Sequence, residues 1–187
     1  MELDDLQYFM DIARTFNNVP KNGKGLELSS FDAGSPPLVD ARHFPDGELQ
    51  YVLINSKFNQ QFYTQGEMAY LMGVFVHEYR YIWQEYYDDS ECFKNEINET
   101  DYNTYHETWI QHEYEQDAEA IKYLFYTDVL KVELKNDKKF NSYDKKIQDK
   151  IIEYMQSNKS FVNVKGAIEK IKASEEPFEK YIKETWY

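Results

Sequence analysis

The residues with the clearest chemical potential are His77 and Glu78, which are adjacent in the segment Val74–Gln84. In the pattern His-Glu-x-x-His, two imidazoles one helical turn apart bind zinc, and the Glu accepts a proton from the metal-bound water. The position of the second His is occupied here by Tyr81. A phenol binds a metal strongly only after it loses a proton with a pKa of about 10, so Tyr81 is a poor replacement for an imidazole. The segment therefore predicts a metal-binding helix that lacks one expected ligand.

A resemblance to a known family rests on this segment and on a second one downstream. Arg80 to Gln84 reads Arg-Tyr-Ile-Trp-Gln, and Glu113–Tyr123 contains the sequence Glu-x-Asp-Ala-x-Ala. With two strand-like runs before the first segment, this order of elements resembles the ImmA/IrrE-type gluzincins. It is most similar to their small members, the minigluzincins, whose motif continues as Arg-His-hydrophobic-Trp-Gln. The resemblance is strongest over residues 37–125.

The resemblance implies a zinc site. It puts His77 and Glu115 in the positions of zinc ligands, and Glu78 in that of the general base. Catalytic zinc sites use three protein ligands and a water molecule, so a third ligand is needed. The candidates are Tyr81 and His112, which lies three residues before Glu115 on the same helical face. With such a ligand the chain is an active intracellular zinc metallopeptidase of ImmA/IrrE type that cleaves a repressor-like protein. Without one it is a pseudoenzyme with no cofactor, in which Glu78 is vestigial.

The net charge of −13 is concentrated in the middle of the chain. Between Glu85 and Glu119 there are 12 acidic residues, and the only basic residue is Lys94, which gives this stretch a net charge of −11. Residues 131–187 contain 13 Lys and 10 acidic residues. Contacts with phosphates need clustered Lys or Arg, so the charge pattern disfavours direct binding to nucleic acid or to a membrane surface. It favours a basic protein partner instead.

The acidic stretch is also rich in tyrosine, a residue that suits contact surfaces. Small acidic, Tyr-rich proteins that inhibit nucleic-acid-handling enzymes, including phage anti-CRISPR and anti-restriction proteins, are similar in composition. This similarity favours a non-catalytic, inhibitory protein with an anionic surface, and the alternative is a solvated loop that keeps the protein soluble. The candidate partner-binding residues are Asp88, Asp89, Glu91, Glu96, Glu99, Asp101, Tyr102, Tyr105, Glu107 and Trp109.

The elements that must position these residues follow from hydrophobic periodicity and turn signals. Together they predict an α+β fold: a small zincin-like domain with a short β-hairpin, a buried motif helix and additional C-terminal helices. The hairpin has its turn at Pro45-Asp-Gly47, and the motif helix begins after an N-cap at Thr64. The expected helices are 4–16, 64–87, 104–132, 144–157 and 161–186, and the expected strands are 26–28, 37–42 and 49–55.

The expected organisation is a gluzincin-like domain over residues 1–130, with a C-terminal helical extension over residues 131–187 packed on it. The only cysteine, Cys92, has no partner for an intramolecular disulfide. The first residues lack the pattern of a signal peptide, and there is no run of about 18 apolar residues. These features predict a cytoplasmic protein.

Overall fold

The computed structural model describes residues 3–31, 39–42, 50–55, 65–88 and 109–173, and it describes side chains over residues 7–26, 69–88 and 109–173. The strands are β1 (Leu26–Phe31), β2 (Val39–Arg42) and β3 (Gln50–Asn55). The α-helices are α1 (Leu3–Phe16), α2 (Gln65–Tyr86), α5 (Glu113–Leu124), α6 (Lys138–Ser142), α7 (Lys145–Asn158) and α8 (Val164–Lys172). Shorter helical turns are η2 (Trp109–Gln111), the π-helix η3 (Phe125–Val129) and η4 (Leu134–Asn136).

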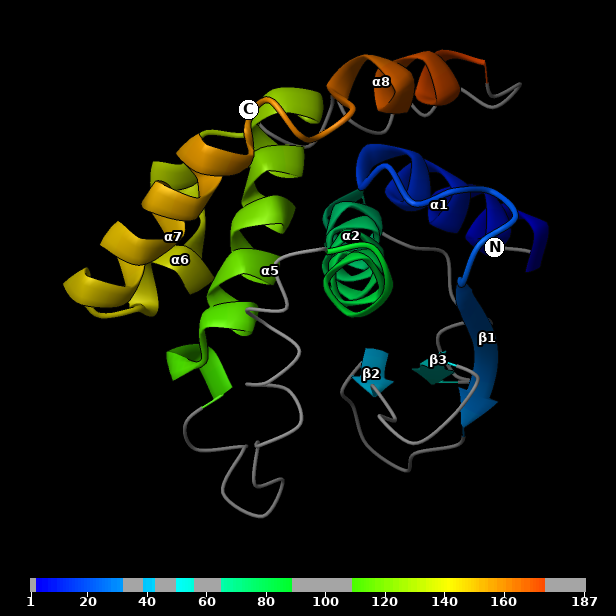
Figure 1. Cartoon of the computed structure of the whole chain (residues 1–187), viewed down its shortest axis with the longest axis horizontal. Helices are drawn as coiled ribbons and strands as arrows, with labels where there is room; N and C mark the ends of the chain where they lie inside the picture. The colour runs from blue at the N-terminus through cyan, green and yellow to red at the C-terminus, as the bar shows by residue number, and fades with distance from the viewer. Residues whose placement is uncertain (1–2, 32–38, 43–49, 56–64, 89–108, 174–187) are drawn as a thin grey trace.

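The expected α+β class is wrong, because helices make up most of the described chain (Figure 1). The strands are only 4 to 6 residues long, whereas α2 alone has 22 residues. They form a small mixed sheet in the order β1-β3-β2, with β1 parallel and β2 antiparallel to β3. The turn expected at Pro45–Gly47 lies outside the described residues. The expected strands at 26–28, 37–42 and 49–55 are present as β1, β2 and β3, but they are a minor part of the described chain beside the helices.

Helix α2 is the central element, with α1 and α5 on two of its sides and the sheet on another (Figure 1). The side chains of Leu71, Met72, Phe75 and Ile82 are fully buried, as expected for a motif helix that is apolar on nearly all sides at its start. Val74, on the same helix, is only partly buried. The N-cap expected at Thr64 lies outside the described residues.

The helices after residue 130 pack against the rest of the chain. One hydrophobic cluster includes Phe9, Phe75 and Phe125 as well as Ile151 and Ile171 from α7 and α8. Helix α7 lies along α5, and α8 lies along α1 (Figure 1). The last expected helix, 161–186, is described as α8 and ends at Lys172, beyond which residues 174–187 are not described. Within the described part of the chain, no helix combines the length and the apolar character needed to cross a membrane.

Candidate functional site

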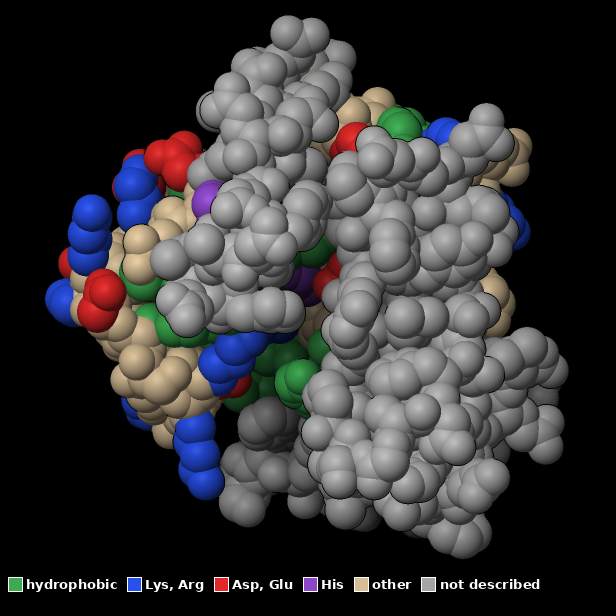
Figure 2. Space-filling view, turned by 90° about the horizontal axis from the view of Figure 1, so that it is seen from below, with side chains coloured by type: hydrophobic (Ala, Val, Ile, Leu, Met, Phe, Trp, Pro, Cys, Tyr) green, Lys and Arg blue, Asp and Glu red, His purple; other side chains and the backbone are tan. Residues whose placement is uncertain are grey.

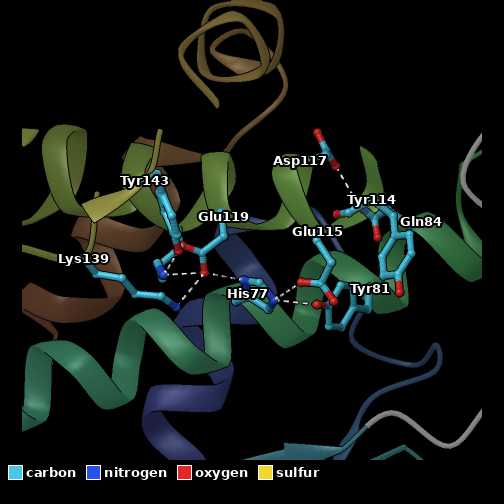
Figure 3. Close-up of polar contacts among 10 residues, drawn as sticks. His77, Tyr81, Gln84, Tyr114, Glu115, Asp117, Glu119, Lys139 and Tyr143 are labelled. Atoms are coloured by element: carbon cyan, nitrogen blue, oxygen red, sulfur yellow. Dashed lines mark hydrogen bonds and ion pairs between the residues drawn. The ribbon is translucent and has the colours of Figure 1, made fainter. Parts of the chain in front are cut away.

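The candidate site lies between one face of α2 and one face of α5 (Figure 3). Residues four apart on a helix project from the same face. On α2 this spacing pairs His77 with Tyr81, and on α5 it pairs Glu115 with Glu119. Because α2 and α5 pack side by side, the two pairs face each other inside the protein.

His77 is the centre of this arrangement, and both of its ring nitrogens have polar neighbours. Its Nε2 lies 2.6 Å from the hydroxyl of Tyr81 and 3.4 Å from Oε2 of Glu115. Its Nδ1 lies 3.2 Å from Oε1 of Glu119. The exposed fraction is 8% for His77 and 1% and 2% for the two glutamates. The imidazole is therefore held between two carboxylates, out of contact with bulk water.

Glu119 extends the contacts away from His77. The ammonium of Lys122 lies 2.5 Å from Oε2 of Glu119, and the hydroxyl of Tyr143 donates to the same oxygen at 3.1 Å. Lys139, at 3.5 Å, adds a second ammonium (Figure 3). We call His77, Tyr81, Glu115, Glu119 and Lys122 the histidine cluster. Sequence reasoning did not select Glu119 or Lys122, although the spacing from Glu115 to Glu119 and then to Lys122 places all three on one helical face.

The pKa values in the histidine cluster reflect burial opposed by ion pairing. Burial lowers the pKa of His77, but hydrogen bonds with Glu115 and Glu119 and the charges of both carboxylates outweigh it, and the result is a pKa of about 9. Burial lowers the pKa of Lys122 to about 8 even though Glu119 opposes the shift. Burial alone would raise the pKa of Glu119, but Lys122 and His77 hold it well below its usual range. At neutral pH the cluster therefore contains charged His77, Lys122 and Glu119.

The histidine cluster does not fit a zinc site. Ligands at about 2.1 Å from a tetrahedral zinc ion are separated by about 3.4 Å. The distance from His77 to Glu115 matches this value, but the 2.6 Å from His77 to Tyr81 is a hydrogen-bond distance and too short for two zinc ligands. The ring of His112 stacks on Tyr114 at the start of α5. Among the described residues, no group of three or more His, Cys, Asp and Glu side chains is placed to hold a metal ion.

Glu78, the residue in the position of the general base, is buried on α2 with an exposed fraction of 8%. The structure thus brings together His77, Tyr81 and Glu115 from the predicted site residues, and Glu78 lies on the same helix as His77 and Tyr81.

Other residues of the resemblance form a second buried cluster between the same two helices. Arg80 donates from Nε to Asp117 Oδ2 at 2.5 Å and from Nη2 to Asp117 Oδ1 at 3.2 Å. Gln84 and Asn158 donate to the same carboxylate at 2.7 Å and 2.8 Å. The Arg80 guanidinium also lies 3.9 Å from the centre of the Trp83 ring. We call Arg80, Gln84, Asp117 and Asn158 the arginine cluster, and its role is to fasten α2, α5 and α7 together.

Only two of the candidate partner-binding residues are described. Asp88 is buried, with an exposed fraction of 8%, which corrects the expectation that it lies on the contact surface. Trp109 is partly buried, with the Lys139 ammonium 4.7 Å from its ring centre and Tyr143 at its edge. The other candidates, at positions 89–107, lie outside the described residues.

The structure also corrects the size of the acidic surface. Of the six acidic residues between Glu85 and Glu119 that the structure describes, four are buried rather than presented to a partner. These four are Asp88, Glu115, Asp117 and Glu119. The other six acidic residues of the stretch fall between positions 89 and 107 and lie outside the described residues.

Comparison with known proteins gives no family assignment: no family model, curated protein or solved structure matches the chain.

Proposed function

We propose that the protein is a cytoplasmic, non-catalytic binding protein. Its scaffold is a gluzincin-like pair of helices, α2 and α5, and its contact surface is the acidic segment of residues 89–108. The partner is a basic protein of the kind that handles nucleic acid, and the protein acts as its inhibitor, in the manner of phage anti-CRISPR or anti-restriction proteins. Binding through an acidic segment requires no cofactor.

The observation that carries this proposal is that both ring nitrogens of His77 already have polar neighbours within the protein. A metallopeptidase needs an imidazole nitrogen directed at the metal and an open position for water. Here Nε2 of His77 forms a hydrogen bond with Tyr81 at 2.6 Å, and Nδ1 faces Glu119 at 3.2 Å. Polar groups that would perform peptide hydrolysis are used to hold the fold together, which supports binding over turnover.

The charge of the acidic segment supports the choice of partner. A net charge of about 2–8 in magnitude is enough for the solubility of a small domain, and this chain carries −13. Within residues 89–108 there are six acidic residues and one Lys. Dense charge of one sign speeds association with an oppositely charged surface and repels nucleic acid. By contrast, the described surface of α6 and α7 shows Lys and acidic side chains interspersed (Figure 2).

The test is a pull-down from host lysate, followed by competition with duplex nucleic acid. The tested variant reverses four acidic residues to Lys: Asp89, Glu91, Glu96 and Glu99. The matched control reverses four acidic residues that are exposed elsewhere: Glu133, Asp149, Glu153 and Glu169. Each control residue takes part in an exposed ion pair, which contributes about 0–1 kcal/mol.

The expected result is a basic partner that the wild type and the control variant retain, that the tested variant loses, and that duplex nucleic acid displaces. Equal retention by both variants would contradict the proposal. Circular dichroism of both variants is needed to show that each keeps the helical fold. Cleavage of a captured protein by the wild type, lost in Glu78→Gln, would instead support the metallopeptidase.

A further inference from the structure

The histidine cluster contains two buried carboxylates and two buried cations. The carboxylates belong to Glu115 and Glu119, and the cations are the His77 imidazolium and the Lys122 ammonium. The exposed fraction of every one of these four residues is 8% or less. We propose that His77 and Lys122 together supply the two positive charges that a divalent metal ion would bring to this place, so that the cluster joins α2 to α5 without a metal.

The distances show which carboxylates each cation contacts. His77 lies between the two carboxylates, with Nε2 3.4 Å from Glu115 and Nδ1 3.2 Å from Glu119, so an imidazolium with a proton on each nitrogen can form an ion pair with both. Lys122 contacts both carboxylate oxygens of Glu119 at 2.5 Å. A metal-binding histidine commonly donates its second N–H to a carboxylate, and Glu119 occupies that position relative to His77. The supporting carboxylate of a metal centre is thus present, but its partners are side-chain cations.

The balance of charge makes a bound metal unnecessary. Two carboxylates and two cations give a cluster close to neutral. A divalent ion bound to His77 would have to displace a ring proton, and it would still leave one positive charge uncompensated in a buried place. The hydroxyls of Tyr81 and Tyr143 contact His77 and Glu119 at 2.6 Å and 3.1 Å. The partly exposed Lys139, 3.5 Å from Glu119, marks the edge of the cluster toward solvent.

This inference concerns how the fold is held, and it stands whether or not the acidic segment binds the proposed partner. Its specific content is the role of Lys122, a residue just beyond the Glu-x-Asp-Ala-x-Ala motif of α5. If the Lys122 ammonium supplies one of the two positive charges, replacing Lys122 alone should destabilise the protein. The replacement removes the closest cation from the buried carboxylate of Glu119. Removing the charges of Lys122 and Glu119 together should lower the stability of the protein by less than the sum of the losses in the two single variants.

The experiment is a double-mutant cycle with Lys122→Met and Glu119→Gln, read as the midpoint of thermal unfolding, Tm, in chelator and in added zinc. Each single variant is expected to lower Tm by about 5 °C or more, and the double variant by clearly less than the sum. The matched control is the exposed pair of Lys145 and Asp149 on α7, changed to Met and Asn. This control should change Tm by no more than about 2 °C.

Wild-type protein should have the same Tm in chelator and in zinc. A fall in Tm on chelation, or a Lys122→Met variant as stable as the wild type, would overturn the inference. If a single variant fails to fold, the double variant decides: recovery of a folded protein supports the charge pairing, and failure of the double variant as well contradicts it.

Discussion

Two buried polar clusters join α2 to α5. They differ in whether their cations can lose a proton and become neutral. The arginine cluster pairs Arg80 with Asp117, and a guanidinium keeps its charge in proteins. The histidine cluster relies on His77 and Lys122, whose pKa values of about 9 and about 8 allow both to become neutral. The same two helices are therefore held by one permanent ion pair and one that responds to pH.

The segment Arg80–Gln84 contributes to both clusters. Arg80 and Gln84 belong to the part of the motif that matches the gluzincin pattern, and they fasten the helices through Asp117. Tyr81 is the departure from the pattern, and its hydroxyl forms a hydrogen bond with Nε2 of His77. Arg80 and Gln84 thus fasten α2 to α5, whereas Tyr81 contacts the neighbouring His77 on its own helix.

The largest expected effect comes from breaking the permanent pair. Asp117→Asn leaves the buried guanidinium of Arg80 without its counter-charge, and such a change should cost about 3–5 kcal/mol of the free energy of unfolding. Glu119→Gln should cost less, because His77 and Lys122 can lose protons and Arg80 cannot. Urea unfolding of both variants at pH 7.5 measures the difference, and an equal or larger loss in Glu119→Gln would break the comparison.

The second effect is a dependence of stability on pH. The pKa of His77 is about 9 in the folded protein and 6.5 in the unfolded chain, so its contribution is fully present below pH 6.5 and is lost as pH rises to 9. The pKa of Lys122 is lowered from 10.5 to about 8, so it penalises the folded state below pH 8 and the penalty disappears as pH rises to 10.5. Stability should fall from pH 6.5 toward pH 8–9 and then recover.

The size of the fall is at most roughly 3 kcal/mol, the free energy that corresponds to the shift of the His77 pKa. The measurement is urea unfolding at half-unit steps between pH 6 and pH 10. The matched variant is His77→Gln, which should be less stable at pH 6 and should show no fall between pH 6.5 and pH 8. A fall of the same size in His77→Gln would assign it to other groups.

Tyr81→Phe should have a small effect, because it removes one hydroxyl and keeps the ring. The lost contact is the hydrogen bond to Nε2 of His77 at 2.6 Å, and such bonds contribute about 1 kcal/mol net. The exposed Tyr70 provides the control, since Tyr70→Phe should leave the free energy of unfolding unchanged. Equal effects in the two variants would show that Tyr81 does not hold His77.

Part of this account was accessible from the sequence and part was not. The apolar pattern predicted α2 with nearly correct bounds, since periodicity over 22 residues is a strong local signal. The α+β class was wrong because helices make up most of the described chain, although each of the three expected strands is present. The gluzincin resemblance selected Glu115, yet Glu119 and Lys122 bear on the site only once α5 is docked on α2.

The acidic residues show the same limit. The sequence shows a run of negative charge, but it does not show that Asp117 has a buried arginine partner or that Glu119 has a buried lysine. Asp88 follows the end of α2 and is buried there, which the run of acidic residues around it does not indicate. Whether a charged side chain is buried depends on partners that are often distant in the chain, and the composition of a segment does not identify those partners.

The measurement that tests the central claim most directly is the metal content of protein purified without chelator from zinc-supplemented cells. Elemental analysis should find well under one zinc ion per wild-type chain, because His77 is held by Tyr81, Glu115 and Glu119. One zinc per chain in the wild type, lost in Glu115→Ala while the fold survives, would contradict the account and restore a metal centre between α2 and α5.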